Sequence, residues 1–437
     1  MNDLMEESHT ATGARQEIPR LLGAASGWGK LLEIEDRLFT ERNLKLYGFS
    51  VAAFYAFIVG WLLCEVVLPP NGKLASIDFC WIWVSGKFAM SSDPVRIYDP
   101  VVLSAVHNAL FHPSECLFQF RHQYVYPPTF LFFTYALGLM PYLAAFAAWI
   151  AATLVLYEAA ICAIIPRPAA LIAAIAAVAV PLNIVFGQNG FLTAGLIGLS
   201  LVFVERRPWL SGVFLGLLTY KPQFGVLFPI ALLASRNWRA LAGATAPTVM
   251  LGVAAAIAFG YQGWPSFIDT LIDRNSGLSP DGHTELRLQS IYGLLHWAGA
   301  GAWISWTVHL TVAAIVAVTV YAVWAEPIPH SLKAAIFCIG AVTVTPYVLP
   351  YDLCILSVAG AFLVRDGMSR GFLPGERTGI LMCFAGLFPV ATPTAPIICA
   401  VLFFLSARRI VAYRCDLLTV SRDEPVGYWL SRTGSLQ

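Results

Sequence analysis

Long apolar stretches dominate this chain of 437 residues and limit what it can fold into. They include residues 46–68 and three runs without any charged residue, at 168–204, 240–267 and 288–325. Each exceeds the roughly 18 to 20 residues that cross a hydrocarbon core as a helix. Because unpaired backbone groups are not tolerated in lipid, such runs must be helical; a barrel would show short alternating segments instead. The sequence therefore predicts an all-α, polytopic membrane protein with about 10 to 12 transmembrane helices.

Composition and motif content exclude several classes of function. Charged residues make up 12% of the chain, against about 25% in an ordinary soluble domain. The formal net charge of +1 argues against a nucleic-acid partner, which requires a strong basic excess. The nine cysteines show no CxxC or His-spaced ligand pattern, and the chain lacks a Walker loop, a dinucleotide fingerprint and a GxSxG motif. We expect no metal and no cofactor.

The distribution of basic residues predicts the orientation in the membrane. Six basic residues precede the first span, which places the N-terminus in the cytoplasm. The segment 69–126 then lies outside, where residues 79–90 and 100–111 are expected to form short surface helices. We predict a cytoplasmic tail at 1–45 with a short helix near 28–39, a transmembrane domain at 46–410 and a cytoplasmic tail at 411–437. Other basic residues suit cytoplasmic turns, namely Arg206, Arg207, Arg236, Arg239, Lys333, Arg365, Arg370, Arg408, Arg409 and Arg414.

Asp78 is the leading catalytic candidate. It stands among aromatic residues where the chain leaves the first span, and a carboxylate there is costly unless it pairs, binds or does chemistry. As a general base it could deprotonate an acceptor hydroxyl that attacks an activated sugar. The alternative is that Asp78 only caps the helix that begins at Phe79.

Two further charged residues occupy apolar surroundings. Lys221 stands between two apolar half-helices in Tyr220-Lys221-Pro222-Gln223, where it either snorkels or binds an anion such as a donor phosphate. Asp352 enters an apolar run and should face a cavity or a cationic partner, for which Lys221 is a candidate.

Polar and aromatic residues of the expected outer face complete the candidate site. Gln188 and Asn189 could bind sugar hydroxyls or cap a turn. Arg121 could bind the donor phosphate or anchor at lipid headgroups. We expect the remaining candidates for binding sugar or acceptor to be Trp83, Tyr126, Gln223 and Tyr347, with Asp352.

Taken together, these motifs resemble glycosyltransferase family 87 over roughly residues 46–407. The motifs that carry the resemblance are, in chain order, Asp78-Phe79, Trp83, Gly86, Asp93-Pro94, Tyr98-Asp99-Pro100, Tyr126-Pro127-Pro128, Gly187-Gln188-Asn189, Lys221-Pro222-Gln223, Pro346-Tyr347 and Tyr351-Asp352. The resemblance implies a GT-C membrane enzyme with Asp78 as its catalytic base. One departure is Tyr347, where some members carry a histidine after the proline. This departure bears on whether a second catalytic group exists there, and on mannose and lipid-acceptor specificity.

The activity that the resemblance implies is transfer of a hexose, with mannose expected, from a polyprenyl-phosphate donor to a lipid or glycan acceptor. The reaction would be inverting and metal-independent, on the extracytoplasmic side of the cell inner (plasma) membrane. The alternative from another class is a transporter or flippase of a lipid-linked sugar without catalysis.

Overall fold

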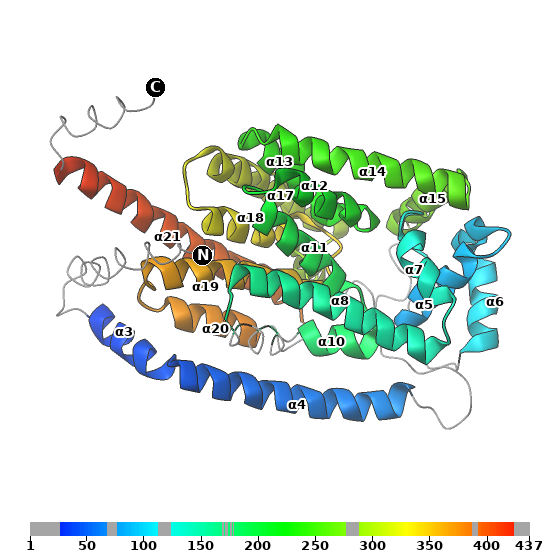
Figure 1. Cartoon of the computed structure of the whole chain (residues 1–437), viewed down its shortest axis with the longest axis horizontal. Coiled ribbons are helices and arrows are strands. Elements are labelled where there is room, and N and C mark those ends of the chain that lie inside the picture. Colours follow the sequence, from blue (N-terminus) through cyan, green and yellow to red (C-terminus); the bar gives the residue numbers. More distant parts are fainter. Residues whose placement is uncertain are drawn as a thin grey trace.

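The fold is a bundle of helices elongated along one axis, seen here in a computed structural model (Figure 1). It describes residues 27–67, 77–111, 124–167, 179–276, 288–386 and 392–423, with residues 170, 174 and 177; these contain no β-strand. Its α-helices are α3 (Gly27–Leu38), α4 (Glu41–Val67), α5 (Phe79–Ala89), α6 (Pro100–Leu110), α7 (Phe130–Gly138), α8 (Tyr142–Ile164), α10 (Ala179–Phe186), α11 (Gly190–Phe203), α12 (Pro208–Leu217), α13 (Leu227–Ala234), α14 (Trp238–Phe259), α15 (Gly263–Ser276), α16 (Ile291–Trp297), α17 (Ala302–Ala325), α18 (His330–Val344), α19 (Cys354–Arg370), α20 (Glu376–Gly386) and α21 (Ala395–Asp423). Its 3-10 helices are η1 (Pro94–Tyr98), η2 (Leu218–Tyr220), η3 (Pro222–Gly225) and η5 (Pro350–Leu353).

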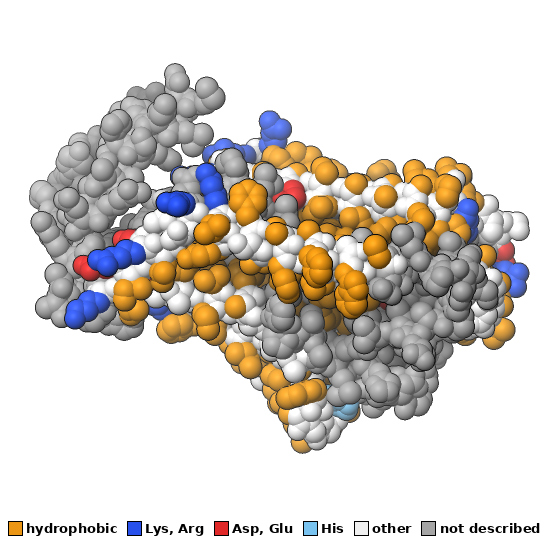
Figure 2. All heavy atoms as spheres, turned by 90° about the horizontal axis from the view of Figure 1, so that it is seen from below, with side chains coloured by type: hydrophobic (Ala, Val, Ile, Leu, Met, Phe, Trp, Pro, Cys, Tyr) orange, Lys and Arg blue, Asp and Glu red, His pale blue; other side chains and the backbone are white. Residues whose placement is uncertain are grey.

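The membrane character predicted from the sequence is confirmed. Among the described residues, five helices are long and apolar enough to cross a membrane, namely those at Arg42–Trp61, Tyr142–Ile164, Trp238–Phe259, Ala302–Ala325 and Ala395–Cys415. Their outer faces carry large apolar side chains such as Phe57, Ile257 and Trp303, exposed by 72%, 80% and 82%. In the face shown in Figure 2, apolar side chains cover the middle while Lys and Arg lie mainly toward the ends. This distribution suits a body surrounded by lipid.

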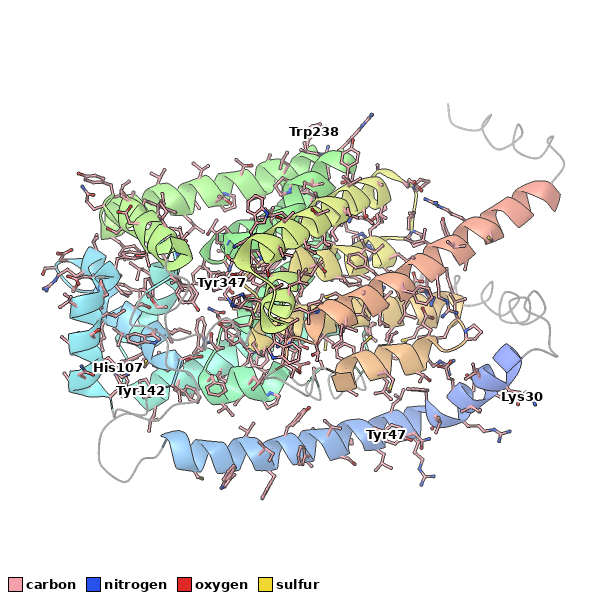
Figure 3. All side chains as sticks on the ribbon, turned by 180° about the vertical axis from the view of Figure 1, so that it is seen from behind. Lys30, Tyr47, His107, Tyr142, Trp238 and Tyr347 are labelled. Atoms are coloured by element: carbon pink, nitrogen blue, oxygen red, sulfur yellow. The ribbon has the colours of Figure 1, made fainter. Side chains whose placement is uncertain are left out.

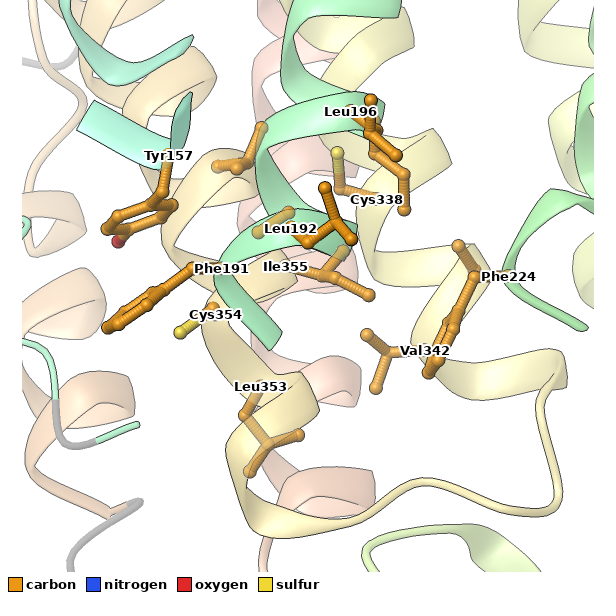
Figure 4. Packing of buried hydrophobic residues seen from close by; sticks show 14 of the residues in the cluster. Tyr157, Phe191, Leu192, Leu196, Phe224, Cys338, Val342, Leu353, Cys354 and Ile355 are labelled. Carbon is orange, nitrogen blue, oxygen red and sulfur yellow. The ribbon is translucent and has the colours of Figure 1, made fainter. Parts of the chain in front are cut away.

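The core is built around two nearly fully buried helices, α11 and α18. Helix α11 packs against α8, α12 and α19, and α18 packs against α17, α19 and α21. Figure 4 shows side chains from these helices, among them Tyr157, Phe191 and Cys338, meeting in one apolar cluster. Because α11 and α18 begin or end at the polar turns that carry candidate site residues, this core fixes the positions of those turns.

Two glycines bring α5 and α7 into direct backbone contact. A Cβ atom on Gly86 would lie 2.3 Å from the carbonyl oxygen of Thr134, and one on Gly138 would lie 2.4 Å from Gly86. Small residues permit such close helix crossings. Both helices lie at the end of the molecule that also carries α6 and α15, opposite α3 (Figure 1). The short helices predicted at 79–90 and 100–111 are present as α5 and α6. The expected surface position is wrong for α5, because most of its residues are buried against other helices.

The helix predicted near 28–39 is confirmed as α3, and a buried carboxylate holds it against the bundle. Glu35 is only 1% exposed and accepts hydrogen bonds from the amides of Gly375 and Thr378, at 3.1 and 2.8 Å. Asp36 pairs with Arg377 beside it, at 2.6 Å. The α3 helix is therefore joined to the turn between α19 and α20.

Candidate functional site

Asp78 immediately precedes α5, and its side chain points to another part of the chain. Its carboxylate accepts a 2.6 Å hydrogen bond from the side-chain amide of Gln188, more than 100 residues away in sequence. It makes no side-chain capping bond to α5, and its backbone is already helical at φ −55° and ψ −26°. The capping interpretation of Asp78 is therefore wrong. An amide that donates to a carboxylate this closely fixes the orientation of that carboxylate.

The turn between α10 and α11 carries Gln188 and Asn189 and is held from several sides. The indole N–H of Trp149 donates to the carbonyl of Gly187 at 3.1 Å. The Asn189 side chain donates to the hydroxyl of Tyr126 at 2.8 Å and makes no cap to α11. Gln188 Oε1 and Asn189 Oδ1 are both buried and accept no hydrogen bond from a described residue. Two buried acceptors without donors are suited to the hydroxyl groups of a ligand.

Gly187 allows this turn to form. Its φ is +63°, and a Cβ atom there would lie 2.4 Å from the Cβ of Phe79. We expect Gly187→Ala to lower the thermal unfolding midpoint of the purified protein because it adds both backbone strain and a steric clash. The matched control is Gly299→Ala, where φ is +88° but nothing lies within 4 Å. The clash should cost about 1–3 kcal/mol beyond that control; equal effects would show that the Phe79 contact is unimportant.

Lys221 and Asp352 form a buried ion pair, as their sequence surroundings predicted. The ammonium Nζ lies 2.6 Å from Asp352 Oδ1, and the two residues are 5% and 2% exposed. The second carboxylate oxygen accepts the amide of Leu349 at 3.2 Å. Burial raises the pKa of the Asp352 carboxyl above its ordinary value, although the Lys221 ammonium acts in the opposite direction. The ring of Tyr351 lies beneath the ammonium, 5.1 Å from it.

Hydrogen bonds connect the Asp78 region with the Lys221–Asp352 pair. The hydroxyl of Tyr220, next to Lys221, donates to the carbonyl of Asn189 at 3.3 Å and shares a 2.6 Å bond with Thr193. On the other side, the Asn183 amide donates to the carbonyl of Tyr351 at 2.9 Å, and its oxygen accepts the Gly190 amide. Four separate segments of the chain therefore meet in one polar network.

The other candidates have different surroundings. Trp83 is 8% exposed, donates to the carbonyl of Met140 at 3.0 Å and packs its ring on Tyr142. The backbone carbonyl of Gln223 accepts the Thr345 hydroxyl at 3.2 Å. Tyr347 packs beside Leu288, Tyr292 and Leu349, and Figure 3 labels it. Arg121 lies outside the described residues.

Sequence reasoning missed two members of the network, Asn183 and Tyr220. Asn183 is fully buried and bridges α10, α11 and η5, while the Tyr220 ring stacks on Phe130 at 5.2 Å. The signal for Asn183 was available, since it is one of the few amides in the uncharged run at 168–204. Tyr220 resembles any other interfacial tyrosine in the sequence.

Comparison with known proteins gives one match. The family model of glycosyltransferase family 87 matches residues 124–350, just over half of the chain. The matched region includes Tyr126, Gln188, Asn189, Lys221 and Tyr347 and excludes Asp78 and Asp352. No curated protein and no solved structure matches.

Proposed function

The chain belongs to glycosyltransferase family 87, and from this premise we propose that it transfers a hexose from a polyprenyl-phosphate donor to a lipid or glycan acceptor. We place the reaction on the extracytoplasmic side of the plasma membrane, with mannose as the first sugar to test. The observation that carries the proposal is the network that joins Asp78 and Gln188 to the Lys221–Asp352 pair. It combines a positioned base with a cation, and both are buried.

In the proposed reaction Asp78 acts as the general base. The acceptor oxygen attacks the anomeric carbon of the donor sugar while its proton passes to the Asp78 carboxylate. The bond between the anomeric carbon and the phosphate oxygen breaks, and the configuration inverts. Gln188, which donates to Asp78 Oδ2, is a positioning residue. The unpartnered oxygens of Gln188 and Asn189 would accept sugar hydroxyls.

Lys221 is the proposed contact for the departing phosphate. An ammonium has three N–H donors, so Lys221 can keep its bond to Asp352 and still donate to a phosphate oxygen. The negative charge that develops on the leaving phosphate is stabilised electrostatically in such a buried site. Because the outer faces of the long helices are apolar, a polyprenyl tail can lie against them in the bilayer.

The test is a transfer assay with the purified protein in lipid. Radiolabelled polyprenyl-phosphate hexoses and nucleotide hexoses are each offered with a membrane-lipid extract as acceptor. We expect labelled product from a polyprenyl-phosphate donor and none from the nucleotide donors. Transfer from nucleotide donors alone would overturn the donor assignment. Movement of the lipid-linked sugar across the bilayer without any new glycosidic bond would favour a flippase.

Gln188→Ala should reduce the turnover number by about tenfold, because the loss of one charge-assisted hydrogen bond leaves the base disordered. The KM for the donor should rise as well, because the variant also removes the Gln188 oxygen that is proposed to accept a sugar hydroxyl. Steady-state transfer kinetics measure both values. Gln262→Ala, at an exposed glutamine near α15, is the control. An unchanged turnover number would remove the positioning role of Gln188.

A further inference from the structure

A second candidate site lies at the other ends of the core helices. A pocket of about 570 Å³ opens where the α11–α12, α13–α14 and α17–α18 turns meet. Its size falls within the range of small-molecule sites in proteins. Helix α11 has 14 residues, so its two ends are about 20 Å apart. The pocket is therefore separate from the Asp78 network, and we call it the basic pocket.

Cations outnumber anions in the basic pocket. Its lining includes Arg236, Arg239 and Lys333, with Glu205 as the acidic residue of the lining. The Glu205 carboxylate lies 3.5 Å from Nδ1 of His330, and its side chain is 63% exposed, so three basic side chains face one carboxylate in this pocket. No described carboxylate pairs with Arg236 or Arg239. Two guanidinium groups are thus available to an anion. Guanidinium groups in general can bind phosphate through two parallel hydrogen bonds.

Helix ends reinforce the positive potential. The first residues of α12, α14 and α18, namely Pro208, Trp238 and His330, all line the pocket. The N-terminus of a helix carries a partial positive charge. Three such ends around one pocket add to the charge of the side chains.

The α13–α14 turn contains an arginine in a left-handed backbone conformation. Arg236 adopts φ +53°, a conformation that costs energy for a residue with a Cβ. The turn is held by Asn237, whose amide donates to the carbonyl of Val204 at 2.8 Å and whose oxygen caps α14. The structure thus keeps an arginine where a glycine would be less strained.

We propose that the basic pocket binds the anionic phosphate group of a ligand, on the membrane face opposite Asp78. The ligand is either an anionic lipid headgroup or a water-soluble phosphate ester. Trp238 is 60% exposed at the start of a candidate span, the position at which tryptophans lie in the headgroup region (Figure 3). The pocket is therefore within reach of both the bilayer surface and the aqueous phase.

Native mass spectrometry of the full chain tests the proposal. The protein is titrated with dioleoyl phosphatidic acid and, separately, with dioleoyl phosphatidylcholine, whose phosphate is compensated by choline. We expect saturable binding of phosphatidic acid that is weakened at least about tenfold in the variant Arg236→Gly/Arg239→Gln. Glycine at residue 236 suits the positive φ, so the turn should remain intact.

The matched control is Arg206→Gln/Arg207→Gln, which removes two exposed arginines from the neighbouring turn but none from the pocket lining. Its binding should stay within about twofold of wild type, whereas an equal loss would show general electrostatic attraction and overturn the proposal. Binding of phosphatidylcholine as tight as that of phosphatidic acid, or no saturable binding, would also overturn it. If the double variant fails to fold, Lys333→Gln takes its place.

Inorganic phosphate as a competitor distinguishes the two sources of ligand. Displacement of phosphatidic acid by millimolar phosphate supports a soluble phosphate ester. Saturable binding that phosphate does not displace supports a lipid headgroup. These measurements do not depend on sugar transfer, so failure of the proposed glycosyltransferase reaction would leave them interpretable.

Discussion

Asp78→Asn is expected to lower the rate of sugar transfer by about 10²- to 10⁴-fold, the usual contribution of a general base. Asparagine has nearly the same size as aspartate and can still accept the hydrogen bond from Gln188. It cannot take up the proton of the acceptor hydroxyl at neutral pH. The measurement is single-turnover transfer from the radiolabelled polyprenyl-phosphate donor, with thermal unfolding of each protein as the folding check.

Asp93→Asn is the matched control for this experiment. Asp93 lies in the same segment before α6, is exposed and makes no side-chain capping bond. The same chemical change there should leave transfer within about twofold of wild type. A folded Asp78→Asn protein that transfers sugar at the wild-type rate would exclude Asp78 as the base, whatever the effect of Asp93→Asn.

The second large effect concerns the Lys221–Asp352 pair. Lys221→Met and Asp352→Asn should each lower the free energy of unfolding by about 3–5 kcal/mol, because each leaves a buried charge without its partner. The double variant should recover most of that loss, since neither charge remains. Transfer should stay low in the double variant, because the proposed phosphate contact is still missing. Denaturation midpoints, donor binding and sugar transfer are measured on all three proteins.

The control for this cycle is the pair Asp36–Arg377, whose side chains are 66% and 20% exposed, against 3% and 7% for Asp352 and Lys221. Asp36→Asn and Arg377→Met should cost less than about 1 kcal/mol each, as for other surface pairs. Full transfer by the stable double variant at residues 221 and 352 would mean that the pair is only structural. Lys221 would then have no part in binding the donor phosphate.

Patterns in the sequence were sufficient for the fold class and for one contact in the site. The apolar runs predicted a polytopic helical membrane protein, because length and hydrophobicity alone determine whether a helix can cross lipid. The Lys221–Asp352 pair was foreseen because two opposite charges in apolar surroundings require a partner. Asp99 caps α6 by accepting from the amides of Val101 and Val102, and the Asp-Pro pair at this helix start is a local pattern.

Contacts between distant polar residues could not be predicted in the same way. The bond between Gln188 and Asp78 joins two segments that are brought together only by the tertiary fold. The sequence around Gln188 fits a residue that caps a turn equally well, so it does not indicate this partner. Trp83 illustrates the opposite difficulty. An aromatic residue near a candidate base suggests a surface on which a sugar ring could stack. In the structure, the Trp83 ring packs on Tyr142 and its N–H donates to the carbonyl of Met140.

The contact between Gly86 and Gly138 restricts the movement of α5 relative to α7. Since the backbones of α5 and α7 touch there, α5 has no room to tilt toward α7. Asp78 precedes α5 directly, so the proposed base stands at the start of a helix that cannot move toward α7. If Asp78 is the base, the choice of acceptor depends on whether the acceptor hydroxyl can reach its carboxylate. In such an enzyme, acceptor selectivity would depend on which acceptors can place a hydroxyl next to Asp78.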